Sequence, residues 1–154
     1  MKVLIQRVSR ARVDVDGKTV GEIGRGVVAL VGVETGDDAP LAAWYAQRLA
    51  AMKLFPGGDK LWQRTLAEVE GCVLAVSQFT LAARTRKGRR PSFDPAAPPE
   101  QAERLYEVFV TELEAAGIPT ARGRFGAMMQ VELVNEGPVT FMLDGPARSD
   151  RKEV

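Results

Sequence analysis

The stretch that decides the fold is VVALVGV, residues 27–33. It contains no polar or charged side chain and is rich in β-branched valine, a composition typical of a strand that is buried on both faces. A second apolar run, CVLAV, occupies residues 72–76. We therefore expect two buried strands in these segments.

The sequence before this stretch also predicts β-structure. Residues 3–8 are rich in β-branched side chains, and residues 13–15 and 19–23 lie on either side of Asp16-Gly17. Asp-Gly between alternating segments is typical of a β-hairpin. A strand followed by a hairpin is expected here.

Two helices are expected after residues 27–33. Asp37 or Asp38 caps the first, and the sequence PGGD, residues 56–59, ends it. The second follows residues 95–99 and ends at Gly117. Apolar residues recur at helical spacing in both, at Leu41, Tyr45, Leu49 and Met52 in the first helix and at Ala102, Leu105, Phe109, Leu113 and Ala116 in the second.

Alternating apolar and polar residues return near the end of the chain. They predict strands at residues 129–133 and 139–143, joined as a hairpin by NEGP, residues 135–138. The order of strands, helix, strand, helix and strands predicts a single compact α/β domain. We expect a mixed, largely antiparallel sheet with two main helices.

Length and charge restrict the class of protein. The 154 residues, of which 45% are hydrophobic, suit one domain, which we place at residues 1–143 with a polar tail at 144–154. No apolar run approaches the roughly 18–20 residues of a membrane helix, and early charges argue against a secretory signal. A cytoplasmic protein without a membrane partner is expected.

The residue types that the chain lacks restrict its chemistry. It has no histidine and a single cysteine, Cys72. This excludes Ser-His-Asp and Cys-His triads and thiolate zinc sites, and the acids form no Asp-x-Asp cluster suited to magnesium. No metal and no cofactor are therefore expected. We interpret Cys72, beside an apolar run, as a buried structural thiol.

Three segments are candidates for function. SQFTL, residues 77–81, follows a buried strand, and strand ends commonly present reacting groups. RTRKGRRPSF, residues 84–93, has five cations within seven residues, although the whole chain has a net charge of only +1. The third segment, residues 123–140, contains Gly137 before Pro138; glycine leaves its carbonyl approachable, and X-Pro bonds can be cis.

Each segment also has an ordinary structural interpretation. Residues 77–81 could be a plain polar strand end, and residues 84–93 could be either a solvated loop or a loop that grips phosphates. Residues 135–138 could be a hairpin loop with a trans bond.

Taken together, the three segments resemble the D-aminoacyl-tRNA deacylase family. The paired motifs Ser77-Gln78-Phe79-Thr80 and Gly137-Pro138-Val139-Thr140 carry the resemblance, with Arg89-Arg90-Pro91-Ser92-Phe93 between them and Gln6-Arg7-Val8 near the start. It covers roughly residues 1–143.

The chain departs from the family pattern at two places. The family usually has Lys-Met-Asn where this chain has Lys60-Leu61-Trp62, a weakly extended segment. It more often has Asp where this chain has Glu136. Neither departure touches the paired motifs.

The resemblance implies hydrolysis of D-aminoacyl-tRNA and glycyl-tRNA as chiral proofreading in translation. It implies a homodimer in which the catalytic pocket of one subunit receives the Gly137-Pro138 loop of the other. In the family that bond is cis, and its backbone oxygens bind the α-amino group of the substrate. The implied catalytic set is Ser77, Gln78, Phe79 and Thr80, and the substrate-binding set is Gly137, Pro138 and Met129. The acceptor end of tRNA, and not DNA, is the expected nucleic-acid partner, held by Arg86, Lys87, Arg89 and Arg90.

The implied mechanism needs no nucleophilic side chain. The 2′-hydroxyl of the terminal adenosine assists water, and backbone N–H groups near Phe79 and Thr80 stabilise the oxyanion. Thr80 as a covalent nucleophile is the alternative, although no customary base accompanies it. A non-catalytic RNA-binding module and a hydrolase of another acyl ester also remain open.

Overall fold

The computed structural model describes residues 1–146. Its elements, in chain order, are β1 (Lys2–Val15), β2 (Lys18–Ile23), β3 (Gly26–Gly32), α1 (Ala39–Ala51), β4 (Phe55–Gly57), β5 (Lys60–Arg64), η1 (Ala67–Val69), β6 (Cys72–Ser77), η2 (Phe79–Ala82), α2 (Pro99–Ala115), β7 (Thr120–Arg122) and β8 (Gln130–Met142). The two expected helices and the two buried strands are all present.

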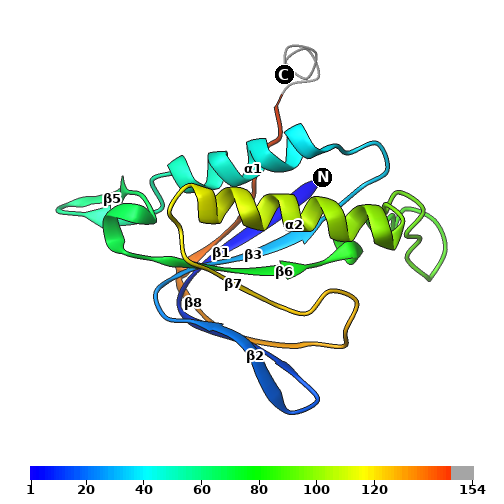
Figure 1. Cartoon of the computed structure of the whole chain (residues 1–154), viewed down its shortest axis with the longest axis horizontal. Helices are drawn as coiled ribbons and strands as arrows, with labels where there is room; N and C mark the ends of the chain where they lie inside the picture. The colour runs from blue at the N-terminus through cyan, green and yellow to red at the C-terminus, as the bar shows by residue number, and fades with distance from the viewer. Residues whose placement is uncertain (147–154) are drawn as a thin grey trace.

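One mixed sheet organises the chain. Its strand order is β2-β1-β3-β6-β7. The two ends of β1 pair with different strands, residues 2–8 with β3 and residues 11–15 with β2, and β8 pairs along the opposite edge of β1 at residues 4–14. The pairs that involve β1 are antiparallel, whereas β3, β6 and β7 run parallel. The predicted α/β class with a mixed sheet is confirmed. Figure 1 shows α1 and α2 lying together over one face of this sheet.

Each face of the sheet has its own apolar core. The helix side buries Val3, Ile5 and Val31 against Leu49 and Phe109. On the opposite face β1 curls away with β2, and their side chains enclose a second core with those of β3 and β6, in the lower part of Figure 1. The strand at residues 27–33 is therefore buried on both faces, as expected.

A close backbone approach depends on Gly26 at the start of β3. A Cβ atom there would lie 1.8 Å from the carbonyl oxygen of Cys72. Only glycine allows β3 and β6 to pair this tightly at their first residues. Cys72 itself is half-buried and packs against the second core, so its side chain is less enclosed than expected.

The predicted C-terminal hairpin is wrong. Residues 130–142 form the single strand β8, and both halves pair with β1, from Asp14 opposite Gln130 to Leu4 opposite Met142. The register shifts near Val8, so residues 136–139 are accommodated as a bulge and not as a turn. Asn, Gly and Pro favour turns and bulges alike, so composition could not distinguish the two.

Three other boundaries differ from the expectation. Residues 3–8 and 13–15 belong to one long strand, β1. The sequence expected to end the first helix, residues 56–59, instead lies in a small hairpin of β4 and β5, and the extended segment at residues 60–62 is part of β5. Asp38 caps α1 as expected, because its Oδ1 accepts from Leu41 N at 3.0 Å.

The rest of the expected polar tail, residues 147–154, lies outside the described residues. No helix within residues 1–146 is both long enough and apolar enough to span a membrane.

Candidate active site

The first motif lies where β6 ends. Ser77 is the last residue of β6 and lies opposite Val31 of β3, and Gln78 N donates to the Val31 carbonyl at 2.8 Å. A Cβ on Gly32 would lie 2.9 Å from the Gln78 oxygen, so β3 approaches this turn closely. The two parallel strands thus present residues 77–80 at their carboxyl ends.

The side chains of this motif are ordered by local contacts. Gln78 Nε2 donates to Thr80 Oγ1. In the first hydrogen bond of η2, Leu81 N donates to the backbone carbonyl oxygen of Gln78 at 3.2 Å. The N–H groups of Phe79 and Thr80 are therefore not used within η2, as is general for the first residues of a helix. They are candidate donors to an oxyanion.

A buried tyrosine lies beneath the same strand. Tyr106 donates its hydroxyl to the Ala75 carbonyl at 2.9 Å, two residues before Ser77. Burial raises the pKa of Tyr106 above its usual value, so the phenol stays protonated at neutral pH. It is a structural donor and not a general base for the motif.

The basic segment forms a closed loop beside this motif. Arg84 and Ser92 exchange two backbone hydrogen bonds, of 2.8 and 2.9 Å, which close the loop at its base. Phe93 contacts the half-exposed Phe79 edge to face, with ring centroids 5.1 Å apart. All five cations of the segment are exposed, and none forms an ion pair within residues 1–146: Arg84, Arg86, Lys87, Arg89 and Arg90.

The second motif lies in the bulge of β8. The Gly137-Pro138 bond is cis, as expected. Asn135 stabilises the bulge from within: its Oδ1 accepts from Val139 N at 3.1 Å, and its Nδ2 donates to Thr140 Oγ1 at 2.6 Å. Gln6 Nε2 of β1 donates to the same Thr140 hydroxyl at 3.2 Å.

Arg7 also belongs to this site, although its place in the sequence predicted no role for it there. Its side chain is buried, its Nε donates to the Glu136 carbonyl at 3.2 Å, and its Nη1 donates to the Leu54 carbonyl at 2.8 Å. The sequence did contain a signal for such a role. Side chains alternate along a strand, so Arg7 lies on the same face of β1 as the buried Val3 and Ile5. A charged residue in such a position needs polar partners.

Met129 lies nearer to the first motif than to the second. Its sulfur accepts from Arg124 N at 3.4 Å and would lie 2.8 Å from a Cβ on Gly123. Gly123 N in turn donates to the Ala75 carbonyl at 2.9 Å, close to the end of β6. The structure therefore places Met129 near the end of β6, on the side of the subunit that carries the Ser77–Thr80 motif.

Within one chain the two motifs do not meet. The register places Arg7, beside Gly137, opposite Val27 and thus level with Val73, four residues before Ser77. Three strand spacings of about 4.8 Å also separate β8 from β6, and four residues of a strand rise about 13 Å. The motifs lie on the order of 20 Å apart in one subunit.

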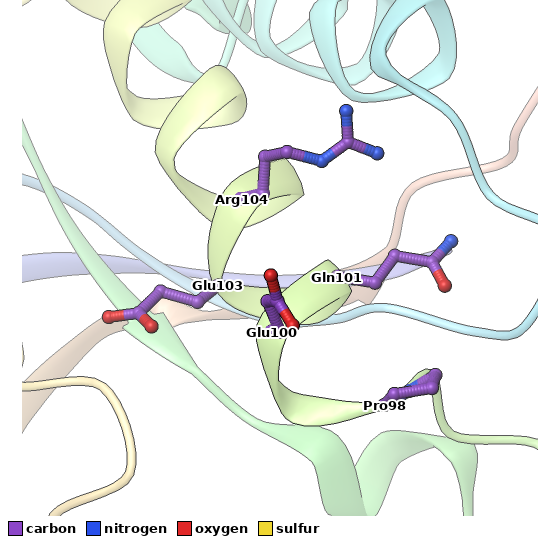
Figure 2. Close-up of a pocket in the computed structure, with 5 residues that line it drawn as sticks. All are labelled: Pro98, Glu100, Gln101, Glu103 and Arg104. Atoms are coloured by element: carbon purple, nitrogen blue, oxygen red, sulfur yellow. The ribbon is translucent and has the colours of Figure 1, made fainter.

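A surface pocket elsewhere does not coincide with either motif. It measures about 600 Å³ and lies at the first turns of α2, lined by Pro98, Glu100, Gln101, Glu103 and Arg104. Figure 2 shows the Glu103 side chain extending away from Gln101 and Arg104, so these groups do not converge. Among residues 1–146 no group of three or more acidic or cysteine side chains is arranged to hold a metal ion.

Comparison with known proteins gives the family. The family model described as D-Tyr-tRNA(Tyr) deacylase matches residues 4–144. A D-aminoacyl-tRNA deacylase of Geobacter sulfurreducens is 56% identical over 149 residues, covering 97% of this chain and 98% of the relative. One of Idiomarina loihiensis is 55% identical and covers 91% and 97%. The chain belongs to the D-Tyr-tRNA(Tyr) deacylase family.

Solved structures share the fold. One described as "c-Myc DNA Unwinding Element Binding Protein" is 36% identical, with a TM-score of 0.87, and covers 96% of this chain and 100% of its own. Another, described as a probable eukaryotic D-amino acid tRNA deacylase, is 21% identical with a TM-score of 0.79, over 92% and 97% of the two chains.

Proposed function

We infer that the protein hydrolyses the ester bond of D-aminoacyl-tRNA and releases the free D-amino acid and tRNA, as chiral proofreading in translation. The family match over residues 4–144 carries this inference. Hydrolysis of charged tRNA takes place where translation does, so we assign the protein to the cytoplasm. The reaction proposed needs no cofactor.

The complete site is proposed to form between two copies of the chain. The distance of about 20 Å between the motifs supports this, because one subunit cannot bring both to one substrate. Strand β8 supports it as well: within residues 1–146 it pairs only with β1, and it exposes Val131, Val134 and Met142. A long edge strand with exposed apolar side chains is a surface that another chain commonly covers.

In such a dimer, Gly137-Pro138 of one subunit lies against the Ser77–Thr80 motif of the other. The exposed backbone of residues 137 and 138 supplies oxygen atoms that accept from the substrate's α-ammonium group. Once the ammonium group and the ester are both held, the two configurations at Cα direct the side chain differently. The D side chain points to open space and the L side chain into the protein wall, whereas glycine has no side chain to exclude.

The chemical step is proposed to rely on backbone donors and on the RNA. Water, assisted by the 2′-hydroxyl of the terminal adenosine, attacks the ester carbon; the 3′-oxygen leaves and takes up a proton. The free N–H groups of Phe79 and Thr80 stabilise the oxyanion, a type of interaction that contributes about 10²–10³-fold in rate. Thr80 Oγ1 already accepts from Gln78, which suits a supporting role.

The exposed cations of the basic loop are proposed to hold the phosphates of the acceptor end. They lie beside the Ser77–Thr80 motif, to which the Phe79–Phe93 contact connects them. Because the whole chain has a net charge of +1, this local concentration of charge is what attracts RNA.

One assay tests the function. Purified protein is incubated with D-tyrosyl-tRNA, L-tyrosyl-tRNA, glycyl-tRNA and a free D-tyrosine ester, with and without exhaustive chelation of metals. We expect D-tyrosyl-tRNA and glycyl-tRNA to be hydrolysed and L-tyrosyl-tRNA to be spared, whether or not metals are present. Binding without hydrolysis would indicate an RNA-binding module, and rapid cleavage of the free ester would indicate a general esterase.

A further inference from the structure

Arg7 fastens the bulge of β8 to the rest of the subunit. Its Nε holds the Glu136 carbonyl and its Nη1 holds the Leu54 carbonyl, so one guanidinium joins two segments that are distant in the sequence. The residue after Glu136 is Gly137, and a Cβ added there would lie 3.3 Å from Arg7 Nη2. The guanidinium therefore helps to fix where the Gly137-Pro138 backbone lies, together with the hydrogen bonds of Asn135 across the bulge.

Two further groups contact this guanidinium. The first is the Glu136 carboxylate, whose Oε2 lies 3.8 Å from Arg7 Nε. The second is the indole of Trp62, on β5, which has its ring centroid 5.8 Å from Arg7 Cζ. This distance is within the range of a cation–π contact, for which tryptophan is the strongest aromatic partner. Arg7 is on β1 and Trp62 is on the small β4–β5 hairpin, so the contact also ties that hairpin to the sheet.

Trp62 has an exposure that packing alone does not explain. Trp62 is 50% exposed, whereas a tryptophan that serves only to fill a hydrophobic core is largely buried. Its neighbour Leu61 is 67% exposed and, because side chains alternate along a strand, projects from the other face of β5. Arg7 is only 8% exposed, whereas the Trp62 ring beside its guanidinium is half exposed, so the ring lies on the solvent side of the guanidinium.

We propose that Trp62 is a positioning residue for substrate selection, because it holds the Arg7 guanidinium that orients the Glu136-Gly137 backbone. This inference rests on the proposed function of Gly137-Pro138 as the segment that binds the α-amino group. Without the ring, water reaches the guanidinium and competes for its bonds to the Glu136 and Leu54 carbonyls. The substrate-binding backbone then samples several positions.

The first test measures the contact without using activity. The Nε–H of Arg7, bonded to the Glu136 carbonyl, is expected to give a slowly exchanging signal in ¹⁵N-resolved NMR spectra. Trp62→Leu should shift this signal, through the loss of the ring current, and accelerate its exchange with water. Trp62→Phe should lie between the two, and Leu61→Ala, on the other face of the strand, should leave the signal unchanged.

The second test measures function in the same variants. A cation–π contact of ordinary strength corresponds to about 2- to 30-fold in an equilibrium constant. We expect Trp62→Leu to lower kcat/KM for D-tyrosyl-tRNA within that range and to narrow the preference for D-tyrosyl- over L-tyrosyl-tRNA. Trp62→Phe should recover part of both, and Leu61→Ala should match the unmodified protein.

The outcomes separate the two proposals. Unchanged Nε–H exchange in Trp62→Leu would overturn the positioning role. The positioning role would also be overturned if Trp62→Leu had unchanged kinetics while Gly137→Ala was impaired. In that case the proposed function of Gly137-Pro138 would stand. If Trp62→Leu and Gly137→Ala both retained full activity and selectivity, the assignment of Gly137-Pro138 would itself be wrong.

Discussion

The ring of Phe79 meets the ring of Phe93 edge to face, with centroids 5.1 Å apart. This contact joins the motif at the end of β6 to the base of the basic loop, where Arg84 and Ser92 are paired. An edge-to-face pair contributes about 0.5–1.5 kcal/mol beyond the area that it buries. The loop that is proposed to hold RNA is therefore positioned by the motif that is proposed to hold the ester.

The first prediction concerns Phe93→Ala. Loss of the ring should loosen the base of the loop and raise KM for D-aminoacyl-tRNA by about 2- to 10-fold. We expect kcat to change less, because the N–H groups of Phe79 and Thr80 remain in place. Steady-state kinetics measure both constants, and Phe93→Tyr, which keeps the ring, is the control. A fall in kcat alone would argue against a role in tRNA binding.

The second prediction concerns the cations of the loop. Replacing Arg86, Lys87 and Arg89 together by Ala should weaken tRNA binding at every sequence tested and lower the slope of log affinity against log salt by about 2–3, since each phosphate contact contributes about 0.7–0.9. Filter binding across a salt series measures the slope. A matched triple of exposed cations elsewhere, Lys18, Arg48 and Lys53, should leave it unchanged. Equal slopes for the two triples would mean that the loop is only a solvated surface.

The third prediction concerns Gly137→Ala. A Cβ there would lie 2.8 Å from Val139 Cγ2, and Gly137 has a φ of +129°, which L side chains rarely adopt. The backbone must shift, and a displacement of about 1 Å at a reacting site can cost about 100-fold in rate. We expect kcat/KM for D-tyrosyl-tRNA to fall more than about tenfold. Gly24→Ala, where a Cβ meets nothing within 4 Å, is the control.

The fourth prediction separates the two mechanisms at Thr80. If the RNA hydroxyl assists the reaction, Thr80→Ala should keep measurable deacylation, whereas tRNA ending in 2′-deoxyadenosine should react about 100-fold more slowly or worse, the usual range for loss of a group that moves a proton. Single-turnover assays with both tRNA forms measure this. An inactive Thr80→Ala together with a reactive 2′-deoxy substrate would instead identify Thr80 as the nucleophile.

The fifth prediction concerns assembly. Sedimentation equilibrium at micromolar concentration should give about twice the chain mass of 16.7 kDa. Val134→Lys places a charge on the apolar part of β8, where Val134 is 41% exposed, and should shift the protein toward the monomer and reduce deacylation in parallel. A monomer with full activity would contradict the two-subunit site.

Local sequence patterns were sufficient for much of the fold. The apolar runs at residues 27–33 and 72–76 are the buried strands, and the apolar spacing from Leu41 and from Ala102 marks the two helices. The Asp38 cap was also predictable. These features depend on side-chain period and on contacts between residues that are near in the chain, so the sequence alone contains them. The lack of histidine likewise excludes the histidine-dependent triads whatever the fold, because composition is independent of how the chain is arranged in space.

Tertiary structure alone decided how β8 pairs and where the site residues lie. Asn135 to Pro138 has the composition of a turn, and only pairing of both flanking segments with β1 makes it a bulge. Arg7 gained a role because it meets Glu136, 129 positions away in the chain. Which strand lies beside which depends on contacts between residues far apart in the chain, and no local period encodes those contacts.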